Sequence, residues 1–383
     1  MPQFSLILFC CLFAVVFYAI AGYPLLLWLV ARRHHHPVHK DAELRRVSFI
    51  IPVYNGEKFL ENKLRSVLAL NYPRELMEIL VVSDASTDAT DEIARRFAPD
   101  GVRLLRVERG GKPAASNAGV PLTSGEILVF NDVRQPLDPE SLRHLVSCFG
   151  DPEVGAVSAQ CRIMAGETIS ELTVGLYWKY ENWMRLQMTR IHSTFGCSGS
   201  YYCLRRSLWM PIPPDTLLDD VWLPLNSLLN GYRLLLEADA IYYDYPTALQ
   251  SEFKRKVRTQ AGLYQLASRL PGLFSARNPM RFHFASGKYG RLIVPWCLLG
   301  MMVATIGMAQ PWRNIAMAGQ FAFYFAAVLD PFLPSGFMLK KLTSPIRTFV
   351  TLMTAGLLAI RIFFVPARSL WKETTVSRPA SFT

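Results

Sequence analysis

Short apolar runs and helical stretches alternate from Val47 to Asn131, and this alternation limits the fold more than any other feature of the sequence. The apolar runs have the length of strands and cover residues 47–53, 77–83, 102–107 and 126–131. The stretches between them have helical periodicity, at residues 57–69, 87–97 and 112–122. Nearly continuous apolar strands are typical of parallel sheets that are covered on both faces. The sequence therefore predicts an α/β fold, with a mostly parallel sheet and helices on both faces.

Residues 6–31 are almost wholly apolar and add a second structural element. A stretch of this length can cross a bilayer core of about 30 Å at about 1.5 Å per residue. No basic region precedes it and no small-residue cleavage signal is evident near its end. We therefore expect a retained transmembrane anchor over residues 1–33 rather than a removed signal peptide.

Three further apolar runs lie near the C-terminus, at residues 292–309, 315–333 and 349–365. Asp330 in the second run and Arg361 in the third leave buried core helices as the alternative. Length and scarcity of charge favour membrane spans. We expect three transmembrane helices within residues 291–367, so about four in all, followed by a tail at residues 368–383.

Residues 253–287 are basic and aromatic and contain no clean span. Their apolar positions fit either a helix in the membrane interface or a helix on a soluble surface; they are Leu263, Leu266, Leu270, Leu273 and Phe274. We predict a basic interfacial region over residues 261–290, after a catalytic domain at residues 34–260.

Basic residues gather on one side of the first apolar run. Almost no charge precedes that run, and it is followed by Arg32, Arg33, Lys40, Arg45 and Arg46. The positive-inside rule then places the central domain in the cytosol and gives a multi-pass protein of the cell inner (plasma) membrane. Four spans place the tail residues Arg368, Lys372 and Arg378 outside, although the same rule favours basic residues inside. Either the last segment is re-entrant or the bias at the first helix dominates.

The formal net charge of +11 suits anionic lipid headgroups and a phosphate-bearing substrate. Nucleic acid would be the competing partner, but no helix-turn-helix, RNA-recognition or zinc-finger pattern accompanies the charge. We therefore expect a lipid bilayer as a partner, and no nucleic acid. The seven cysteines lack metal-ligand spacing, so we expect them to be reduced and mostly buried.

Polar motifs stand at four places along the chain. They are SDASTD at residues 83–88, NDVR at 131–134, LDD at 218–220 and RKVR at 255–258. Ligands of parallel sheets bind at the carboxyl ends of the strands, where Asp84 and Asp132 are expected to lie. Carboxylates accept hydrogen bonds from ribose or bind metal ions, and arginines hold phosphate oxygens. The motifs therefore point to the handling of a sugar nucleotide.

With its motifs in this order, the chain from about Val47 to Arg258 resembles the membrane-bound family 2 glycosyltransferases of bacterial polysaccharide synthesis. The resemblance rests on VSFIIPVYNGEKFLENKLRSVLALNYPRELMEILVVSDASTD, GGKPAASNAG, ILVFNDVRQPLDPESL, the Gly/Ser turn before YYCLRRS, LDD and EFKRKVRT. It implies a GT-A (Rossmann-like) fold and an enzyme that transfers a sugar from a nucleoside-diphosphate sugar.

The resemblance also implies which residues bind the donor. Asp84 matches the aspartate that contacts the nucleotide base or ribose, and Tyr54 and Glu57 match the loop beside it. Lys112 and Asn117 match further donor contacts. The alternative for Asp84 is a cap on the helix at residues 87–97, for which Ser86 or Thr87 is also suited.

The NDVR segment departs from the family pattern Asp-x-Asp. Asp132 matches the first metal-binding carboxylate, and Arg134 replaces the second. One carboxylate together with phosphate oxygens can hold a hard cation, so the resemblance implies a divalent metal, Mg²⁺ or Mn²⁺, at Asp132. Arg134 would face the same way as Asp132 in an extended segment, and would pair with a phosphate or with Asp132 itself.

Asp220 matches the family's general base, with Asp219 as its acidic neighbour. A carboxylate here would take the proton of the acceptor hydroxyl, and a second carboxylate can raise its pKa toward neutrality. The alternative for this pair is stabilisation of a helix N-terminus. Arg258 matches the arginine of Gln-x-x-Arg-Trp that meets the donor diphosphate, with Arg255 at the glutamine position and Thr259 at the tryptophan position.

The missing tryptophan puts processive synthesis in doubt, because that ring stacks on the acceptor sugar in processive synthases. Trp183 or Tyr202 could supply another acceptor platform. We expect an inverting transferase that uses a nucleoside-diphosphate sugar, with a UDP-sugar favoured, and a lipid-linked or growing saccharide acceptor in surface polysaccharide synthesis. A processive synthase that secretes its polymer and a catalytically degenerate scaffold are the alternatives, and the sequence leaves the oligomeric state open.

Overall fold

The structure is a computed structural model that describes residues 2–164, 169–245, 249–334 and 337–370. Within these residues a seven-stranded sheet has the order β3-β2-β1-β4-β6-β5-β7. The strands are β1 (Val47–Val53), β2 (Met77–Asp84), β3 (Val102–Val107), β4 (Ile127–Asn131), β5 (Val154–Ile163), β6 (Tyr201–Arg205) and β7 (Arg233–Asp244). β6 is antiparallel to both of its neighbours, and the other pairs are parallel. The prediction of a mostly parallel sheet is confirmed.

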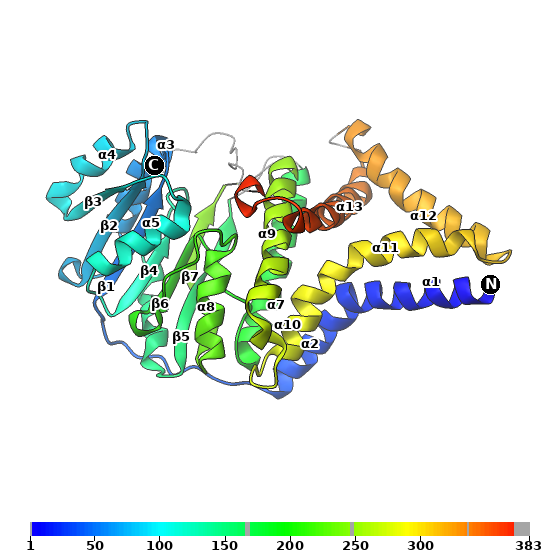
Figure 1. The fold of residues 1–383 in the computed structure, drawn as a ribbon, viewed down its shortest axis with the longest axis horizontal. Coiled ribbons are helices and arrows are strands. Elements are labelled where there is room, and N and C mark those ends of the chain that lie inside the picture. The colour runs from blue at the N-terminus through cyan, green and yellow to red at the C-terminus, as the bar shows by residue number, and fades with distance from the viewer. Residues whose placement is uncertain (1, 165–168, 246–248, 335–336, 371–383) are drawn as a thin grey trace.

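Helices cover both faces of the sheet (Figure 1). One face packs against α3 (Glu57–Leu68), α4 (Thr90–Arg96) and α6 (Ser141–Ser147). The other packs against α5 (Gly111–Gly119), α7 (Ile169–Ile191), α8 (Asp219–Leu229) and α9 (Leu249–Arg269). Side chains alternate across a strand, so Phe49 and Ile51 enter the first core while Ile50 enters the second.

The loop before α4 differs from its prediction. The helix begins at Thr90 rather than near residue 87, and neither Ser86 nor Thr87 caps it. The Asp88 carboxylate accepts hydrogen bonds from the backbone N–H groups of Thr90 and Glu57, both at 3.0 Å, and the Glu57 carboxylate accepts one from Ala89 at 3.2 Å. Glu57 therefore links the start of α3 to the start of α4.

Four helices in the described part of the chain are long and apolar enough to cross a membrane: Pro2–Arg33, Arg281–Ile306, Trp312–Phe332 and Lys340–Phe363. They contain α1 (Pro2–Phe17) and α2 (Tyr23–Arg33), α10 (Arg281–Phe284) and α11 (Gly290–Ile306), α12 (Trp312–Leu329), and α13 (Lys340–Leu358). Together they project from one side of the sheet domain, with α1 alongside α11 (Figure 1). We refer to these four below as the apolar helices.

Asp330, which raised doubt about the second C-terminal run, is satisfied within the protein. It is 1% exposed and accepts hydrogen bonds from the hydroxyls of Thr343 and Ser344, both at 2.7 Å. Arg347 forms an ion pair with it at 3.2 Å. The acidic group therefore joins the end of α12 to the start of α13 and faces other protein groups.

The segment predicted to lie in the membrane interface is built differently. α9 continues through residue 260 to Arg269, and Leu266 and Leu273 are buried in the core formed with α8. Leu263 and Leu270 are buried in the same core, while Phe274 is 43% exposed, so most of the apolar face of this segment packs against the domain. The predicted tail from residue 371 onward lies outside the described residues.

Candidate active site

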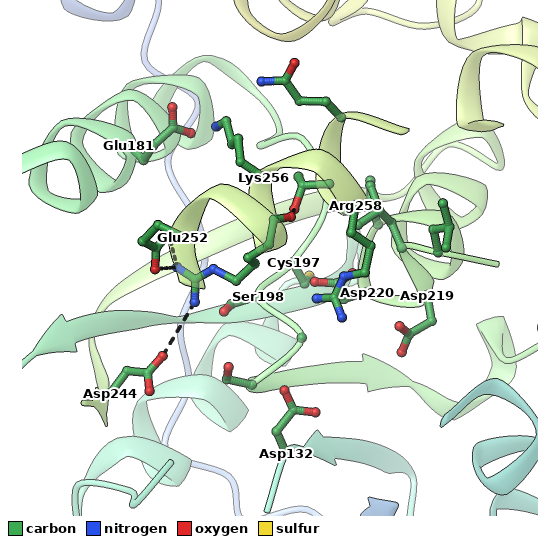
Figure 2. Close-up of a pocket in the computed structure, with 18 of the residues that line it drawn as sticks. Asp132, Glu181, Cys197, Ser198, Asp219, Asp220, Asp244, Glu252, Lys256 and Arg258 are labelled. Atoms are coloured by element: carbon green, nitrogen blue, oxygen red, sulfur yellow. Dashed lines mark hydrogen bonds and ion pairs between the residues drawn. The ribbon is translucent and has the colours of Figure 1, made fainter. Parts of the chain in front are cut away.

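One cavity of about 1410 Å³ lies at the carboxyl ends of β1, β2 and β4 and extends between α7, α9 and the apolar helices. Its lining includes most of the residues that the sequence singled out: Tyr54, Asp84, Lys112, Asp132, Arg134, Asp219, Asp220, Arg255 and Arg258. Figure 2 shows Arg258 directed toward Asp220 and Asp219, with Asp132 below them. Residues from four distant motifs are thus brought to one site.

Asp84 ends β2 and fixes the loop that follows β3. Its carboxylate accepts hydrogen bonds from the backbone N–H groups of Gly110, at 2.7 Å, and Gly111, at 2.9 Å, and pairs with Arg109. The Arg109 guanidinium lies 3.6 Å from the centre of the Tyr54 ring. The alternative interpretation, that Asp84 caps α4, is therefore wrong. Asp84 and Arg109 together shape one end of the cavity.

Lys112, in the first turn of α5, reaches across the cavity to the acidic residues. Its ammonium group lies 2.7 Å from Asp132 Oδ1 and 3.5 Å from Asp219 Oδ2. It also donates a hydrogen bond to the Gly199 carbonyl at 3.1 Å. Burial alone would lower the pKa of Lys112, but the charges of Asp132 and Asp219 hold that pKa above its usual range. Lys112 therefore stays cationic in the middle of the site.

Asp219 and Asp220 begin α8, where the helix N-terminus favours negative charge. The Cys197 N–H donates a hydrogen bond to the Asp220 carbonyl at 2.9 Å, which holds the turn at residues 195–200 against the start of α8. Burial, and then the charge of Asp219, raise the pKa of Asp220 to about 6, although Lys112 and Arg258 oppose the rise. A carboxylate with this pKa is suited to general-base chemistry near neutral pH.

Arg258 lies one turn along α9 from Arg255 and faces the acidic pair (Figure 2). Burial lowers the pKa of Arg258, and the attraction of Asp220 opposes that shift. A guanidinium stays charged under such a perturbation because its usual pKa is far above neutrality. The site therefore places a permanent cation beside the candidate base.

Arg134 and Arg255 meet at a partner that the sequence did not indicate. Arg134 forms an ion pair with Asp244 at 3.1 Å, and Arg255 lies 3.9 Å from the same carboxylate and 2.7 Å from Glu252. The prediction that Arg134 pairs with Asp132 is therefore wrong. Arg134 pairs with Asp244 instead, because the end of β7 places this carboxylate next to both arginines. The alternative, that Arg134 pairs with a phosphate, stays a prediction.

Four predicted site residues are absent from the lining of this cavity. Asn117 uses its amide to bind the backbone of Ile212, at 2.8 Å in both directions, and Glu57 is held by Ala89. Tyr202 is fully buried and stacks on Phe130, and Trp183 packs on the core beside Tyr180. Tyr202 therefore has no exposed surface to offer an acceptor, and Trp183 lies outside the cavity lining. Tyr177, Trp178 and Tyr180 of α7 line the cavity instead.

The acidic residues fit a divalent cation only when a substrate supplies further ligands. Among the residues that the structure describes, no three His, Cys, Asp or Glu side chains are grouped to hold a metal ion. The Asp132 side chain is 37% exposed and lines the cavity. A hard cation in a nucleotide site can be held by one or two carboxylates plus phosphate oxygens and water. Asp132 therefore suits a metal that is shared with a diphosphate.

Sequence reasoning missed several charged residues of the cavity, notably Arg109, Glu181, Asp244, Lys288 and Arg291. The basic loop RGGK at residues 109–112 carried a signal for Arg109, since it joins a strand end to a helix start. The others had no such signal, because they come from separate elements and acquire a role only through tertiary contact.

The turn before β6 makes a test of the site possible. A Cβ atom on Gly199 would lie 2.9 Å from Asp220 Oδ2, so Gly199→Ala is expected to displace the carboxylate and lower kcat at least 10-fold, with little change in fold. Gly175→Ala is the matched control, because nothing lies within 4 Å of its added Cβ. Steady-state kinetics and thermal unfolding of both variants would check this; equal kcat values would contradict it.

A GT-A-like sheet with acidic and cationic groups at its strand ends defines a class of enzyme, the nucleotide-sugar-dependent transferases. Residues 48–209 match Glycosyl transferase family 2, and residues 134–365 match Glycosyl transferase family group 2. The chain therefore belongs to the family 2 glycosyltransferases and is a glycosyltransferase.

Known relatives agree with this class. Poly-β-1,6-N-acetyl-D-glucosamine synthase of Staphylococcus aureus is 25% identical over 248 residues, which are 63% of this chain and 59% of the synthase. The match thus spans less than two thirds of that relative's length. Glycosyltransferase AglE of Haloferax volcanii is 44% identical over 89 residues, 22% of this chain and 29% of AglE.

A solved structure shows the same fold over nearly the whole chain. Mannosyltransferase PcManGT from Pyrobaculum calidifontis, in complex with GDP-Man and Mn²⁺, superimposes with a TM-score of 0.73 and 24% sequence identity. The match covers 93% of this chain and 99% of the mannosyltransferase. The arrangement of sheet domain and apolar helices therefore also occurs in a solved glycosyltransferase.

Proposed function

We propose that this protein is an inverting glycosyltransferase that works at the cytoplasmic face of a membrane. It transfers a sugar from a nucleoside-diphosphate sugar to a lipid-linked or growing saccharide acceptor. The observation that carries the proposal is the single cavity that holds Asp84, Asp132, Asp220 and Arg258 and continues between the apolar helices. A soluble donor and a membrane-bound acceptor can meet in such a cavity.

The donor nucleotide is assigned to the end lined by Tyr54, Asp84 and Arg109. Aromatic and guanidinium planes there offer stacking surfaces to a base, and the start of α5 presents the positive end of a helix dipole to phosphates. Lys112 and Arg258 supply cationic charge next to that position. A diphosphate therefore has partners between the nucleotide end and Asp220.

In the reaction, the Asp220 carboxylate accepts the proton of an acceptor hydroxyl as its oxygen forms a bond to the anomeric carbon. The bond between that carbon and the diphosphate oxygen breaks, and the electron pair leaves with the nucleoside diphosphate. Arg258 and Lys112 stabilise the negative charge that grows on the leaving group. A divalent cation, when bound at Asp132 with the diphosphate, would add Lewis-acid stabilisation of the same charge.

Charge and position support the proposed membrane face. Arg32 and Arg33 end α2 at the junction between the first apolar helix and the sheet domain. Positive charge at such a junction favours the cytosolic side of the membrane. Both features support a catalytic domain in the cytosol.

The proposal is tested by nucleotide release from a panel of UDP-, GDP- and dTDP-sugars, using detergent-purified protein with and without Mg²⁺ or Mn²⁺. We expect release from one nucleotide class and stimulation by the metal. GDP-mannose belongs in the panel because PcManGT was solved with it. The absence of turnover with every donor and metal, in protein that is folded by thermal unfolding, would overturn the proposal.

A processive polysaccharide synthase is a second candidate. The similarity to a poly-N-acetylglucosamine synthase favours it, and so do the cavity-lining residues of the apolar helices, such as Leu292 and Phe349. Product length separates the two functions: single-sugar products support the first, and a long ladder of products from one acceptor supports the second.

A further inference from the structure

Three cations surround one carboxylate in the part of the cavity next to the apolar helices. The Glu181 carboxylate on α7 accepts a hydrogen bond from Lys288 at 2.9 Å and pairs with Arg291. Lys256 of α9 donates a hydrogen bond to the Tyr177 hydroxyl, and its ammonium lies 4.8 Å from the centre of that ring. We call Lys256, Lys288 and Arg291 the cationic cluster.

The cationic cluster carries more positive charge than its surroundings balance. Glu181 is the one anion paired within the cluster of three cations. Glu252 also attracts Lys256, but it is itself paired with Arg255 at 2.7 Å. Burial lowers the pKa of Lys256 to about 8, although Glu181 opposes that shift. Buried charge without a counterion is costly, so a site of this kind is stabilised when an anion enters it.

The cationic cluster faces a different part of the cavity from Arg258, which is assigned to the donor diphosphate. Lys256 and Arg258 are two positions apart on α9, so their side chains leave the helix about 200° apart. Figure 2 shows the Lys256 amine directed toward Glu181 and the Arg258 guanidinium directed the other way, toward Asp220. The helix therefore presents one cation to each of two regions of the same cavity.

Hydrocarbon side chains from three apolar helices line the cavity beside the cationic cluster. They are Ile20 from the first, Leu292 and Val294 from α11, and Phe349, Leu352 and Met353 from α13. Lys288 and Arg291 belong to the same helical segment as Leu292. A ligand that fits this region has an anionic head beside a long apolar chain.

We propose that the cationic cluster binds the phosphate that joins an acceptor saccharide to a hydrocarbon chain lying between the apolar helices, so that the acceptor is a saccharide carried on a lipid phosphate or diphosphate. This inference rests on the proposed transferase function and names its acceptor class. The end of a neutral polysaccharide carries no negative charge that three cations could bind. A lipid phosphate also places its head group next to α9, within the cavity that contains Asp220.

A polyprenyl phosphate is a suitable probe, because the polyprenol has the same chain without the anion. For the detergent-purified full chain, we expect at least 10-fold tighter binding of the phosphate than of the polyprenol or of phosphatidylglycerol. Lys256→Gln is expected to weaken binding of the polyprenyl phosphate about 10-fold or more. That substitution leaves Glu181 paired with Lys288 and Arg291. Lys254→Gln is the matched control, since Lys254 is exposed on the same helix, and should bind as the unmodified chain does.

Each result has a separate meaning. Equal binding of polyprenol would overturn the inference, and equal binding of phosphatidylglycerol would assign the cluster to bulk lipid and overturn it as an acceptor site. If the Lys256→Gln variant bound neither nucleoside diphosphate nor the lipid, the cluster would be needed for folding of the cavity rather than for lipid binding. That result would also overturn the inference. If the enzyme turns over a donor but does not prefer polyprenyl phosphate to polyprenol, only the acceptor site is contradicted. If it prefers polyprenyl phosphate but turns over no donor, the transferase proposal is contradicted.

Discussion

Asp220→Asn is expected to lower kcat/KM for sugar transfer by about 10²–10⁴-fold, the usual contribution of a general base. Asparagine keeps the shape of the side chain and cannot accept the proton of the acceptor hydroxyl. The Cys197 N–H bonds to the backbone carbonyl of residue 220, so the turn before β6 should be retained. Transfer rates with saturating donor would measure the effect, and a loss below 10-fold would remove Asp220 from the role of base.

The pH dependence of the unmodified enzyme gives a second measure of the same residue. The base works as the carboxylate, and the pKa of Asp220 is raised to about 6 by burial and by Asp219. Protonation removes the base as the pH falls through about 6, so kcat/KM should rise up to that pH and level off above it. Asp219→Asn is the matched control: it removes the neighbouring charge, retains the base, and should move the acid limb to lower pH.

The part of the fold that the sequence predicts is the part where local pattern and tertiary environment agree. β1, β2, β3 and β4 are apolar runs bounded by polar loops, and α3 has a clear apolar side, so each element was recognisable alone. Their parallel arrangement follows from the alternation with helices. The helix boundaries were less predictable. α13 begins at Lys340, well before the apolar run at residue 349, because backbone hydrogen bonding continues through polar residues.

The order of the strands was beyond sequence reasoning. β6 is inserted between β4 and β5 and runs antiparallel to both, although it follows β5 in the chain. Pairing of this kind is decided by contacts between residues far apart in sequence, such as Phe130 opposite Tyr202. That same pairing buries Tyr202, which explains why its interpretation as an acceptor platform was wrong.

The site also has a part that could be predicted from the sequence and a part that could not. Asp84 and Asp132 were predicted at one edge of the sheet because each follows a strand, and Asp220 and Arg258 were added through the family resemblance of their motifs; all four line the cavity. The pairing of Arg134 was not predictable, since its partner Asp244 lies 110 positions away. The cationic cluster was still less predictable, because Lys256 and Arg291 lie on α9 and α11, their partner Glu181 lies on α7, and these residues meet only in three dimensions.

Arg258→Ala is expected to lower kcat by about 10²–10³-fold, the range seen when one group that stabilises a developing anion is removed. The guanidinium lies where a leaving diphosphate would gain charge, beside Asp220 and across the cavity from Asp132 (Figure 2). Arg258→Lys keeps one positive charge but loses the planar fork, so we expect an intermediate loss. Lys254→Ala removes a cation from an exposed position of the same helix and should keep full activity. Single-turnover rates at saturating donor would separate the chemical step from binding, and equal rates for Arg258→Ala and the unmodified enzyme would place leaving-group stabilisation on Lys112 or the metal.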